Sequence, residues 1–534
     1  METLTQLPLS VRRLIDDIES LEHPRPASLV NVLKNSRITE EDLQPWTDYA
    51  HPPGDSYGRK PVHKSDHYEI MVMSWNPGDF SAIHDHGYTQ WGAVKIFGNA
   101  EHATFRVDDG NISTLARWQV KKGETLGVSH SLIHQMGNAT DTPFISLHVY
   151  GDYQSHENIT GDASIYDPSA QAIQRVNGGV FFCLPDSKIL RREKGPKGDF
   201  PTTLRHQVEE IKRKRKYERP RQSDFEACFS LDKKEDLLAF ISDIIDQETN
   251  KYSNSIQWKI LNSELKAAAK LQDQLFTKTS EEDRFHKYAE VYDELIGKPC
   301  ISDFIGPYLR FFFSNYGIKN KEIISIGCGT GLTEQFMIET LDVPGDHVYG
   351  MDISPAMVRE ARQRIDADTG DVLDLDPTVK KWDIAYAGLN VFQYLSSENL
   401  QNAIKATSGI LKEGGYFVGD FITPDHIRWY PNIMYAENSN VVSFRTAKLV
   451  ETGGLMYQES DIVNVSFLGK KMDVHYAGSH KRYLPPMNRV RAYFLKHFGS
   501  EVKLFDAVSL KPVSEEADSC PSTRYLVIAR KSLS

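Results

Sequence analysis

Short runs of alternating hydrophobic and polar residues dominate residues 65–185. A period of two is typical of strands with one buried face. The runs are separated by Gly, Asn, Asp and Pro, and they read HYEIMVMSW, TQWGAVKIF, HATFRV, PFISLHVY and GGVFFCL. Many short strands with such turns predict a β-barrel or a β-sandwich.

The pattern becomes charged and helical from residue 186 to residue 280. Apolar residues recur at helical spacing from Leu237 to Ile245, behind the capping residues Asp232 and Glu235, so we expect a helix that packs on another element. The basic run 211–221 favours a solvated helix or linker over a nucleic-acid site. After residue 320, short apolar strands alternate with helical stretches, which predicts a doubly wound α/β domain.

Length and charge narrow the classes of protein and partner. A chain of 534 residues is too long to fold around one hydrophobic core, so we expect two or three domains. The net charge of -11 argues against a nucleic-acid or anionic membrane partner, so we expect small-molecule partners. No apolar run could span a membrane, the N-terminus does not read as a signal peptide, and the five cysteines lack paired spacing. These features predict a cytoplasmic protein.

The first candidate site begins at His84, Asp85 and His86. Residues two apart in a strand point to the same face, so both imidazoles can face a barrel interior together with His134 from a returning strand. Three neutral imidazoles leave coordination positions of a divalent metal open for a thiolate and O2. Zinc is the alternative to iron, and a surface turn beside a core histidine is the alternative to a metal site.

A row of polar residues follows on one later strand. Ser146, His148 and Tyr150 share one face by the same period of two. A hydroxyl, an imidazole and a phenol in line can form a hydrogen-bonded relay. The alternative is a polar ladder that faces solvent.

Together these motifs make residues 40–185 resemble cysteine dioxygenase, a cupin-fold enzyme that oxidises cysteine with O2 on mononuclear iron. The resemblance implies that His84, His86 and His134 bind Fe(II). It assigns the catalytic relay to Ser146, His148 and Tyr150.

The same resemblance indicates where the thiol binds. Arg59, in the segment Tyr57-Gly58-Arg59, falls where the family holds the substrate carboxylate, and a guanidinium fork suits that group. Trp91 stands where animal enzymes have a cysteine that crosslinks to the relay tyrosine, so Tyr150 is expected to remain uncrosslinked. We therefore expect Tyr57, Arg59 and Trp91 to contact the substrate, which is cysteine, 3-mercaptopropionate or a larger thiol.

The second candidate site begins with an apolar strand, residues 323–326, that runs into the glycine-rich turn GCGTG. Glycines allow close approach of the backbone to a ligand and a sharp turn into a helix. Asp352 ends the next strand, where an acid can bind ribose hydroxyls, and Asp371 follows at a position suited to an adenine amino group. A dinucleotide-binding domain is the competing interpretation.

The order of GCGTG, MDISPAMVREAR, GDVLDL, WDIAYAGLNVFQYL and LKEGGYFVGDF resembles class I methyltransferases. The resemblance implies S-adenosylmethionine as the cofactor, with Asp352 on the ribose and Asp371 on the adenine. The segment FHKYAEVYDEL, which contains Tyr288 and Tyr292, resembles the helix that covers the cofactor in small-molecule methyltransferases. Ser325 departs from the acid often found before the loop. The loop glycines expected to wrap the methionine part are Gly327, Gly329 and Gly331.

The predicted architecture is multidomain. It comprises a cysteine-dioxygenase-like, all-β cupin barrel with flanking helices (1–190), a charged helical linker (191–280) and a Rossmann-like α/β methyltransferase (281–534). An insert at 424–483 is expected to form the pocket of a small-molecule methyl acceptor, with His426 or Tyr430 near the acceptor.

We expect a bifunctional enzyme that oxidises a thiol with O2 to a sulfinate and methylates a related small molecule. The first alternative is a different oxidation at the iron site, such as carbon–sulfur bond formation or rearrangement of a cysteinyl compound. The second is a thiol-sensing cupin that regulates the methyltransferase. The oligomeric state does not follow from the sequence.

Overall fold

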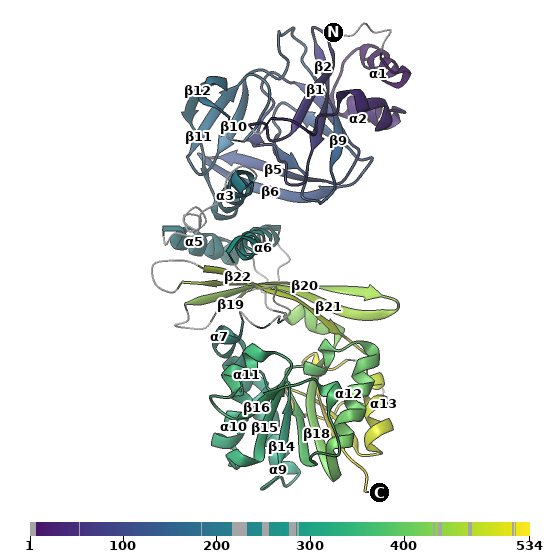
Figure 1. The fold of residues 1–534 in the computed structure, drawn as a ribbon, viewed down its shortest axis with the longest axis vertical. Coiled ribbons are helices and arrows are strands. Elements are labelled where there is room, and N and C mark those ends of the chain that lie inside the picture. Colours follow the sequence, from purple (N-terminus) through teal and green to yellow (C-terminus); the bar gives the residue numbers. More distant parts are fainter. Residues whose placement is uncertain are drawn as a thin grey trace. The chain divides into compact units, whose positions relative to one another are not determined.

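The computed structural model describes residues 7–52, 54–182, 184–215, 232–247, 256–276, 283, 285, 288–430, 433–435, 440–467, 473–514, 517 and 519–533 (Figure 1). The chain divides into two compact units. Unit 1 comprises Met1–Gln247 with Ser255–Phe276, and unit 2 comprises Glu248–Asn254 with Thr277–Ser534.

Unit 1 contains two sheets. The five-stranded sheet has the order β1 (Gly58–Lys64), β2 (Tyr68–Trp75), β9 (Phe144–Gly151), β4 (Trp91–Ile96) and β7 (Thr125–Ser129). The eight-stranded sheet has the order β12 (Ile189–Lys194), β11 (Ala172–Val176), β10 (Ala163–Asp167), β3 (Ile83–His84), β8 (Ile133–Gly137), β5 (Ala100–Asp108), β6 (Asn111–Val120) and β13 (Lys197–Gly198). These elements confirm the expected β-rich cupin-type region.

Both faces of the five-stranded sheet are buried, because its strands alternate between two hydrophobic clusters. Val94 and Ile96 of β4 belong to the cluster shared with the eight-stranded sheet. Ala93 of β4 and Leu147 of β9 belong to the cluster covered by α1 (Leu9–Glu19) and α2 (Pro26–Asn35). Residues on the first of these faces therefore point into the interior between the sheets.

The run GGVFFCL, expected as a strand, is irregular where it is described. Val180 and Phe182 are buried, but their amides donate to side chains, the Tyr57 hydroxyl and the Ser56 Oγ, rather than to a neighbouring strand. The hydrophobic run is thus part of the core without sheet pairing. Cys183 lies outside the described residues.

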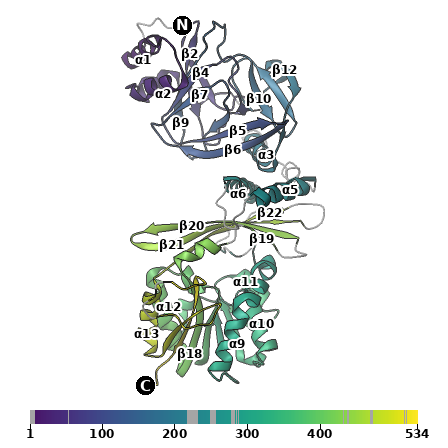
Figure 2. The same ribbon diagram turned by 180° about the vertical axis from the view of Figure 1, so that it is seen from behind.

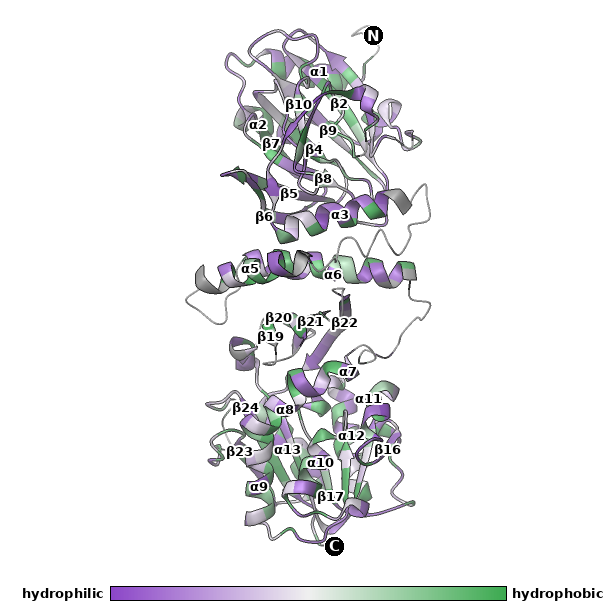
Figure 3. Ribbon diagram, turned by 90° about the vertical axis from the view of Figure 1, so that its left-hand side faces the viewer, coloured by the Kyte–Doolittle hydropathy of each residue, from purple (hydrophilic) through white to green (hydrophobic). Residues whose placement is uncertain are grey.

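The next helices among the described residues are α3 (Phe200–Arg215), α5 (Asp232–Gln247) and α6 (Ile256–Phe276). Helices α3 and α6 pack on each other and on β6, and each carries separate hydrophobic and hydrophilic patches (Figure 3). A buried ion cluster joins Arg205 of α3 to Glu264 of α6 and Glu101 of β5. Much of the range 191–280 is therefore packed onto unit 1. Residues 216–221 of the basic run lie outside the described residues.

Unit 2 is built on a seven-stranded sheet that is parallel from β16 to β18, whereas β24 runs antiparallel to both neighbours. Helices α9, α10 and α11 lie on one side of the sheet and α12 and α13 on the other (Figures 1 and 2). The strand order is β16 (Asp366–Thr369), β15 (Val348–Asp352), β14 (Ile323–Ile326), β17 (Trp382–Ala387), β18 (Leu411–Ile422), β24 (Arg524–Arg530) and β23 (Val502–Asp506). The helices are α7 (Ala289–Tyr292), α8 (Lys298–Cys300), α9 (Gly306–Asn315), α10 (Leu332–Thr340), α11 (Pro355–Ala361), α12 (Ser397–Ile410) and α13 (Met487–Phe498). This sheet confirms the Rossmann-like class.

The insert at 424–483 forms a separate antiparallel sheet of β19 (Ile433–Tyr435), β20 (Val441–Thr452), β21 (Leu455–Ser466) and β22 (Asp473–Tyr483). No helix among the described residues is long and apolar enough to cross a membrane. The three described cysteines, Cys300, Cys328 and Cys520, are free thiols.

Candidate active sites

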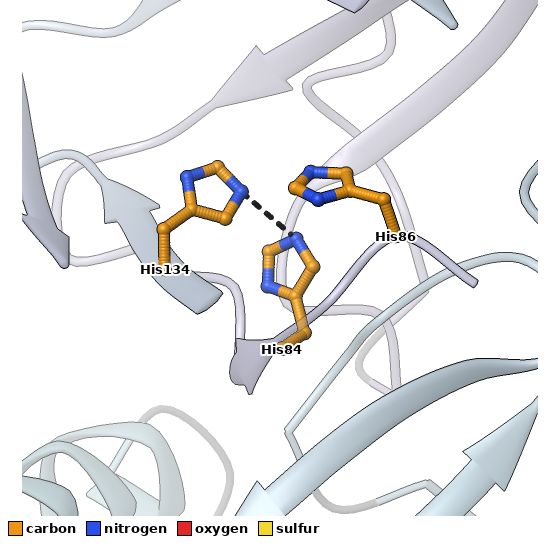
Figure 4. Close-up of side chains that lie close together, drawn as sticks. All are labelled: His84, His86 and His134. Carbon is orange, nitrogen blue, oxygen red and sulfur yellow. Dashed lines mark hydrogen bonds between the residues drawn. The ribbon is translucent and has the colours of Figure 1, made fainter. Parts of the chain in front are cut away.

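Three histidines from two strands meet inside unit 1 (Figure 4). His84 ends β3 and pairs directly with His134 of β8, and His86 follows two residues later in the loop. One ring nitrogen from each of the three lies within 4.8 Å of the other two. The strand ends before His86, yet the alternation expected for His84 and His86 still brings both rings toward His134.

The other contacts of these histidines turn one nitrogen of each ring toward the group, where Nε2 of His84 and Nε2 of His134 lie 3.1 Å apart. His84 Nδ1 lies 2.8 Å from the Ala82 carbonyl oxygen, and His134 Nδ1 lies 2.7 Å from His102 Nε2. His86 Nε2 is buried without a hydrogen-bond partner among the described residues. Burial lowers the pKa of all three imidazoles, that of His84 to about 4, so they are neutral at pH 7. Neutral, converging imidazoles fit a divalent transition metal.

The polar row on β9 is a continuous hydrogen-bonded chain. Ser146 Oγ lies 2.7 Å from His148 Nε2, and His148 Nδ1 lies 2.7 Å from the Tyr150 hydroxyl. Trp75 Nε1 donates to Ser146 Oγ at 2.8 Å. Burial lowers the pKa of His148 to about 3 and raises that of Tyr150, so both are uncharged at pH 7. The row is buried and is not a solvent-facing ladder.

A small cavity of about 30 Å³ borders the three histidines and this row. Arg59 lines it and donates from Nη2 to Thr160 Oγ1 at 2.9 Å. Tyr57 also lines it, stacked on Trp75, and burial raises its pKa to about 12. His148 and Tyr150 border the cavity directly, whereas Ser146 acts only at the far end of the row.

Trp91 lies away from this cavity, which corrects the expectation that it contacts the substrate. Its side chain points to the cluster beneath α1 and α2 and covers Gly151. The neighbouring Gly92 pairs with Tyr150, and a Cβ placed on Gly92 would lie 3.1 Å from the tyrosine ring. The position that faces the relay tyrosine is therefore Gly92. Since glycine has no side chain, the expectation of an uncrosslinked Tyr150 remains.

The glycine-rich turn of unit 2 lines a much larger cavity of about 1310 Å³. Gly327 and Gly329 border it with φ angles of +71° and +56°, conformations that favour glycine. Gly331 does not border the cavity. Its Cα lies against α11, where a Cβ would meet Ala361 at 3.2–3.3 Å, so this glycine permits helix packing.

The other residues expected at the cofactor border the same cavity. Asp352 accepts from the amides of Gly329 and Ser354, both at 2.9 Å, and burial raises its pKa. Asp371 accepts from the Leu373 amide at 2.9 Å. Tyr288 is buried and accepts a hydrogen bond from Arg445. These side chains lie at the carboxyl ends of parallel strands and in the segment above them, where ligands bind in such sheets.

The two residues expected near the methyl acceptor also border this cavity. His426 Nδ1 lies 3.2 Å from Thr523 Oγ1, and burial is the main cause that lowers its pKa to about 3. Tyr430 is buried, and its pKa is lowered because the effect of Arg445 and Arg482 exceeds that of burial. One cavity is thus bordered both by residues expected at the cofactor and by residues expected at the acceptor.

Two family models match the chain. Residues 6–157 match cysteine dioxygenase type I, and residues 324–417 match a methyltransferase domain. The chain joins a cysteine dioxygenase domain to a methyltransferase domain. Human cysteine dioxygenase type 1 and its counterpart from Pongo abelii are each 26% identical over 151 residues, which cover 27% of this chain and 76% of those proteins.

Solved methyltransferases resemble the C-terminal part. An S-adenosylmethionine-dependent methyltransferase from Clostridium acetobutylicum is 19% identical with a TM-score of 0.37, covering 47% of this chain and 99% of that protein. DesVI from Streptomyces venezuelae is 18% identical with a TM-score of 0.36, covering 47% and 100%.

The cysteine dioxygenase domain contains a residue that the motifs did not reveal. His102 of β5 is buried and holds His134 Nδ1, which directs the other nitrogen of His134 toward the three-histidine group. His102 lies on a different strand from His84 and His134, so no regular spacing in the sequence connects it to them. Only the pairing of β5 with β8 brings it to His134.

The methyltransferase domain contains a buried acid next to Ser325, Glu334, that the motifs did not reveal. Glu334 of α10 accepts from Ser325 Oγ at 2.5 Å and borders the cavity, and its Oε2 is buried without a partner among the described residues. Burial raises its pKa to about 7. An acid in the first turn after the glycine loop was the available sequence signal. Sequence reasoning also missed the cavity-lining Arg445 and Arg482.

Proposed function

We propose that the cysteine dioxygenase domain oxidises cysteine or a cysteine-like thiol with O2 to a sulfinate. The observation that carries this proposal is the convergence of three neutral histidines, the Tyr150 relay and Arg59 on one cavity. His84, His86 and His134 would hold Fe(II), which supplies the activation of O2 and of the thiolate. Every other role falls to side chains of this domain.

Arg59 orients the thiol by its carboxylate. Its guanidinium lines the cavity and makes no ion pair with a described carboxylate, so it can meet both oxygens of the substrate. Tyr57 forms part of the wall and, with its raised pKa, remains a neutral phenol.

Tyr150 donates a hydrogen bond into the cavity and can shift a proton along the row. His148 is neutral, so one of its nitrogens donates and the other accepts. Ser146, held by Trp75, fixes the far end of the row and therefore the tautomer of His148. This arrangement keeps the Tyr150 hydroxyl in one position relative to the bound thiol.

We propose that the methyltransferase domain transfers a methyl group from S-adenosylmethionine to a small molecule related to the thiol or its sulfinate. Gly327 and Gly329 would border the methionine part, with Asp352 at the ribose and Asp371 at the adenine. Glu334 supplies the carboxylate for the methionine ammonium, because the residue borders the cavity and its Oε2 has no hydrogen-bond partner among the described residues. Methyl transfer is an in-line displacement, so these residues act by alignment.

The deciding experiment loads the full chain with iron anaerobically, adds cysteine, admits air, and records oxygen uptake with product mass. Gain of two oxygen atoms on cysteine supports the proposal and makes cysteine sulfinate the first methyl acceptor to test. A different product mass would replace sulfinate formation by another oxidation. Bound metal without oxygen uptake across a panel of thiols would instead support a sensing domain.

A further inference from the structure

Arg445 is a buried cation of the methyltransferase cavity without a described acidic partner. It lies on β20, borders the cavity and is 6% exposed. Its guanidinium donates to two neutral hydroxyls, Ser443 Oγ at 3.2 Å and the Tyr288 hydroxyl. Because Tyr288 is expected to cover the cofactor, Arg445 lies beside the place where the methyl group would be transferred.

Arg482 of β22 repeats this arrangement on the same sheet. It borders the cavity and donates to the Tyr394 hydroxyl at 2.8 Å and to Ser460 Oγ at 3.3 Å. Its Nε is buried without a partner among the described residues. Like Arg445, it forms no ion pair with a described carboxylate.

A third arginine of the cavity shows how the fold treats a structural cation. Arg524 borders the same cavity but forms an ion pair with the fully buried Asp420. A charge taken out of water without a counter-ion is unfavourable, so Arg445, which is buried, and Arg482, which is partly buried, indicate an anion that arrives with a ligand.

The residues between the two arginines agree with a positive region. Arg445 and Arg482 both act on the Tyr430 hydroxyl strongly enough to lower its pKa despite burial. His426 is neutral because its pKa is low, first through burial and then through Arg524 and Arg482. The positive charge at this part of the cavity therefore comes from guanidinium groups.

We propose that Arg445 and Arg482 together bind an anionic group, a carboxylate or a sulfinate, of the methyl acceptor. This inference rests on the proposed methyltransferase function and names the acceptor class as a small acid. The acids that border the cavity all lie outside the insert, whereas both arginines come from it; the acids are Asp283, Asp303, Glu334, Asp352 and Asp371. The two arginines of the insert are then left for an anionic group of the acceptor.

The test measures binding of four probes to the full chain saturated with S-adenosylhomocysteine, by calorimetry. Cysteine carries a carboxylate, hypotaurine a sulfinate, cysteine sulfinate both and cysteamine neither. We expect at least one anionic probe to bind and cysteamine not to bind. Arg445→Gln and Arg482→Gln should each weaken that binding at least about tenfold. If the variants lose affinity for cysteine, the arginines bind a carboxylate. If they lose affinity for hypotaurine, the arginines bind a sulfinate.

Lys448→Gln is the matched control, because Lys448 lies on the same strand as Arg445 but is exposed and pairs with Glu459. It should leave every affinity unchanged. Arg445→Lys and Arg482→Lys retain the charge and replace the glutamine variants if thermal unfolding shows that those do not fold. They should bind the anionic probe with intermediate affinity, since lysine lacks the planar fork.

Three results would overturn the inference. In one, the glutamine variants lose S-adenosylhomocysteine, which would assign the arginines to the carboxylate of the cofactor. In another, they bind the anionic probes as well as the unchanged chain does. In the third, the unchanged chain binds S-adenosylhomocysteine but none of the anionic probes. Failure of the unchanged chain to bind S-adenosylhomocysteine at all would instead defeat the proposed methyltransferase function.

Discussion

The two cavities of this protein differ in how their walls are assembled. In the cavity of the cysteine dioxygenase domain, about 30 Å³, strands β3, β8 and β9 hold His84, His134, His148 and Tyr150, and loops between strands supply further residues, among them His86. The methyltransferase cavity, about 1310 Å³, collects residues from position 283 to position 524 and from two sheets. A small strand-built site holds a fixed chemistry, whereas a large composite site can hold a constant cofactor beside a variable acceptor.

The charges of the two cavities differ in the same way. The described residues that border the first include neutral histidines, Asp85, which accepts from the Ser164 amide and the Tyr166 hydroxyl, and one arginine, Arg59, which suits a thiol with one carboxylate. The second has acids at the cofactor end and the arginines Arg445 and Arg482 on the insert. The comparison therefore predicts that substitutions at the first site abolish or strongly reduce oxygen uptake. Substitutions at the second site should instead weaken the affinity for a ligand.

The largest effect is expected from His86→Ala. Removing one of three metal ligands should abolish both bound iron and oxygen uptake, a loss of at least about 100-fold. Iron content and oxygen uptake with cysteine are the measurements. S-adenosylhomocysteine affinity serves as the internal control and should not change, since its cavity lies in the other compact unit. Retained iron with full activity would contradict the three-histidine site.

Tyr150→Phe tests the relay separately from the metal. The phenylalanine fills the same space but cannot donate or accept a proton, so oxygen uptake should fall on the order of 100-fold. Iron content should stay unchanged, because the residues that could bind the metal are His84, His86 and His134, and Tyr150 is not among them. Ser146→Ala should have a smaller effect, since Ser146 reaches the cavity only through His148. Equal rates for all three proteins would show that the row has no catalytic role.

His102→Leu addresses the support of a metal ligand. It removes the partner of His134 Nδ1, so iron affinity should fall about tenfold by loss of orientation. Competition with a chelator measures that affinity. His102→Gln keeps a hydrogen-bond acceptor on a side chain of similar reach and should restore most of it. If leucine and glutamine behave alike, His102 is only a packing residue.

The sequence predicts the dioxygenase site better than the methyltransferase acceptor site, for a physical reason. His84, His86 and the row on β9 follow a period of two, which holds wherever a strand forms. Trp91 shows the limit, because a shift of one residue reverses the face, and Gly92 is the neighbour of Tyr150. The run GGVFFCL was predicted as a strand from hydrophobicity alone, but its amides are satisfied by side chains.

The methyltransferase fold follows from the order of its motifs, yet the acceptor residues do not. Arg445 and Arg482 lie on strands β20 and β22, whose sequences contain no recognisable motif. Only the pairing of both strands with β21 brings the two arginines to one cavity. Position 325 lacks the acid that class I methyltransferases often have before the loop, and the acid that contacts Ser325 is on a different element, Glu334 of α10. Equivalent charges can be supplied from different backbone positions, which a linear motif does not detect.

Glu334→Gln is expected to have the smallest effect and the most specific pH dependence. Burial raises the pKa of Glu334 to about 7, whereas the ammonium of S-adenosylhomocysteine binds the ionised carboxylate. The affinity of the unchanged chain for S-adenosylhomocysteine should therefore rise as the pH increases from 6 to 8, and exceed that of the variant about tenfold at pH 8. The variant should show no such rise.

Thermal unfolding measures the same carboxyl independently, because ionisation of Glu334 should weaken the stability of the free protein while it strengthens ligand binding. A carboxyl whose folded pKa exceeds its unfolded pKa loses stability as the pH rises from about 4.5 to about 7, because the unfolded chain releases the proton first. Without ligand, Glu334→Gln should thus unfold at a higher temperature than the unchanged protein at pH 8, and at a similar temperature at pH 5. If both proteins show the same pH dependence in binding and unfolding, Glu334 is not the acid that meets the cofactor ammonium.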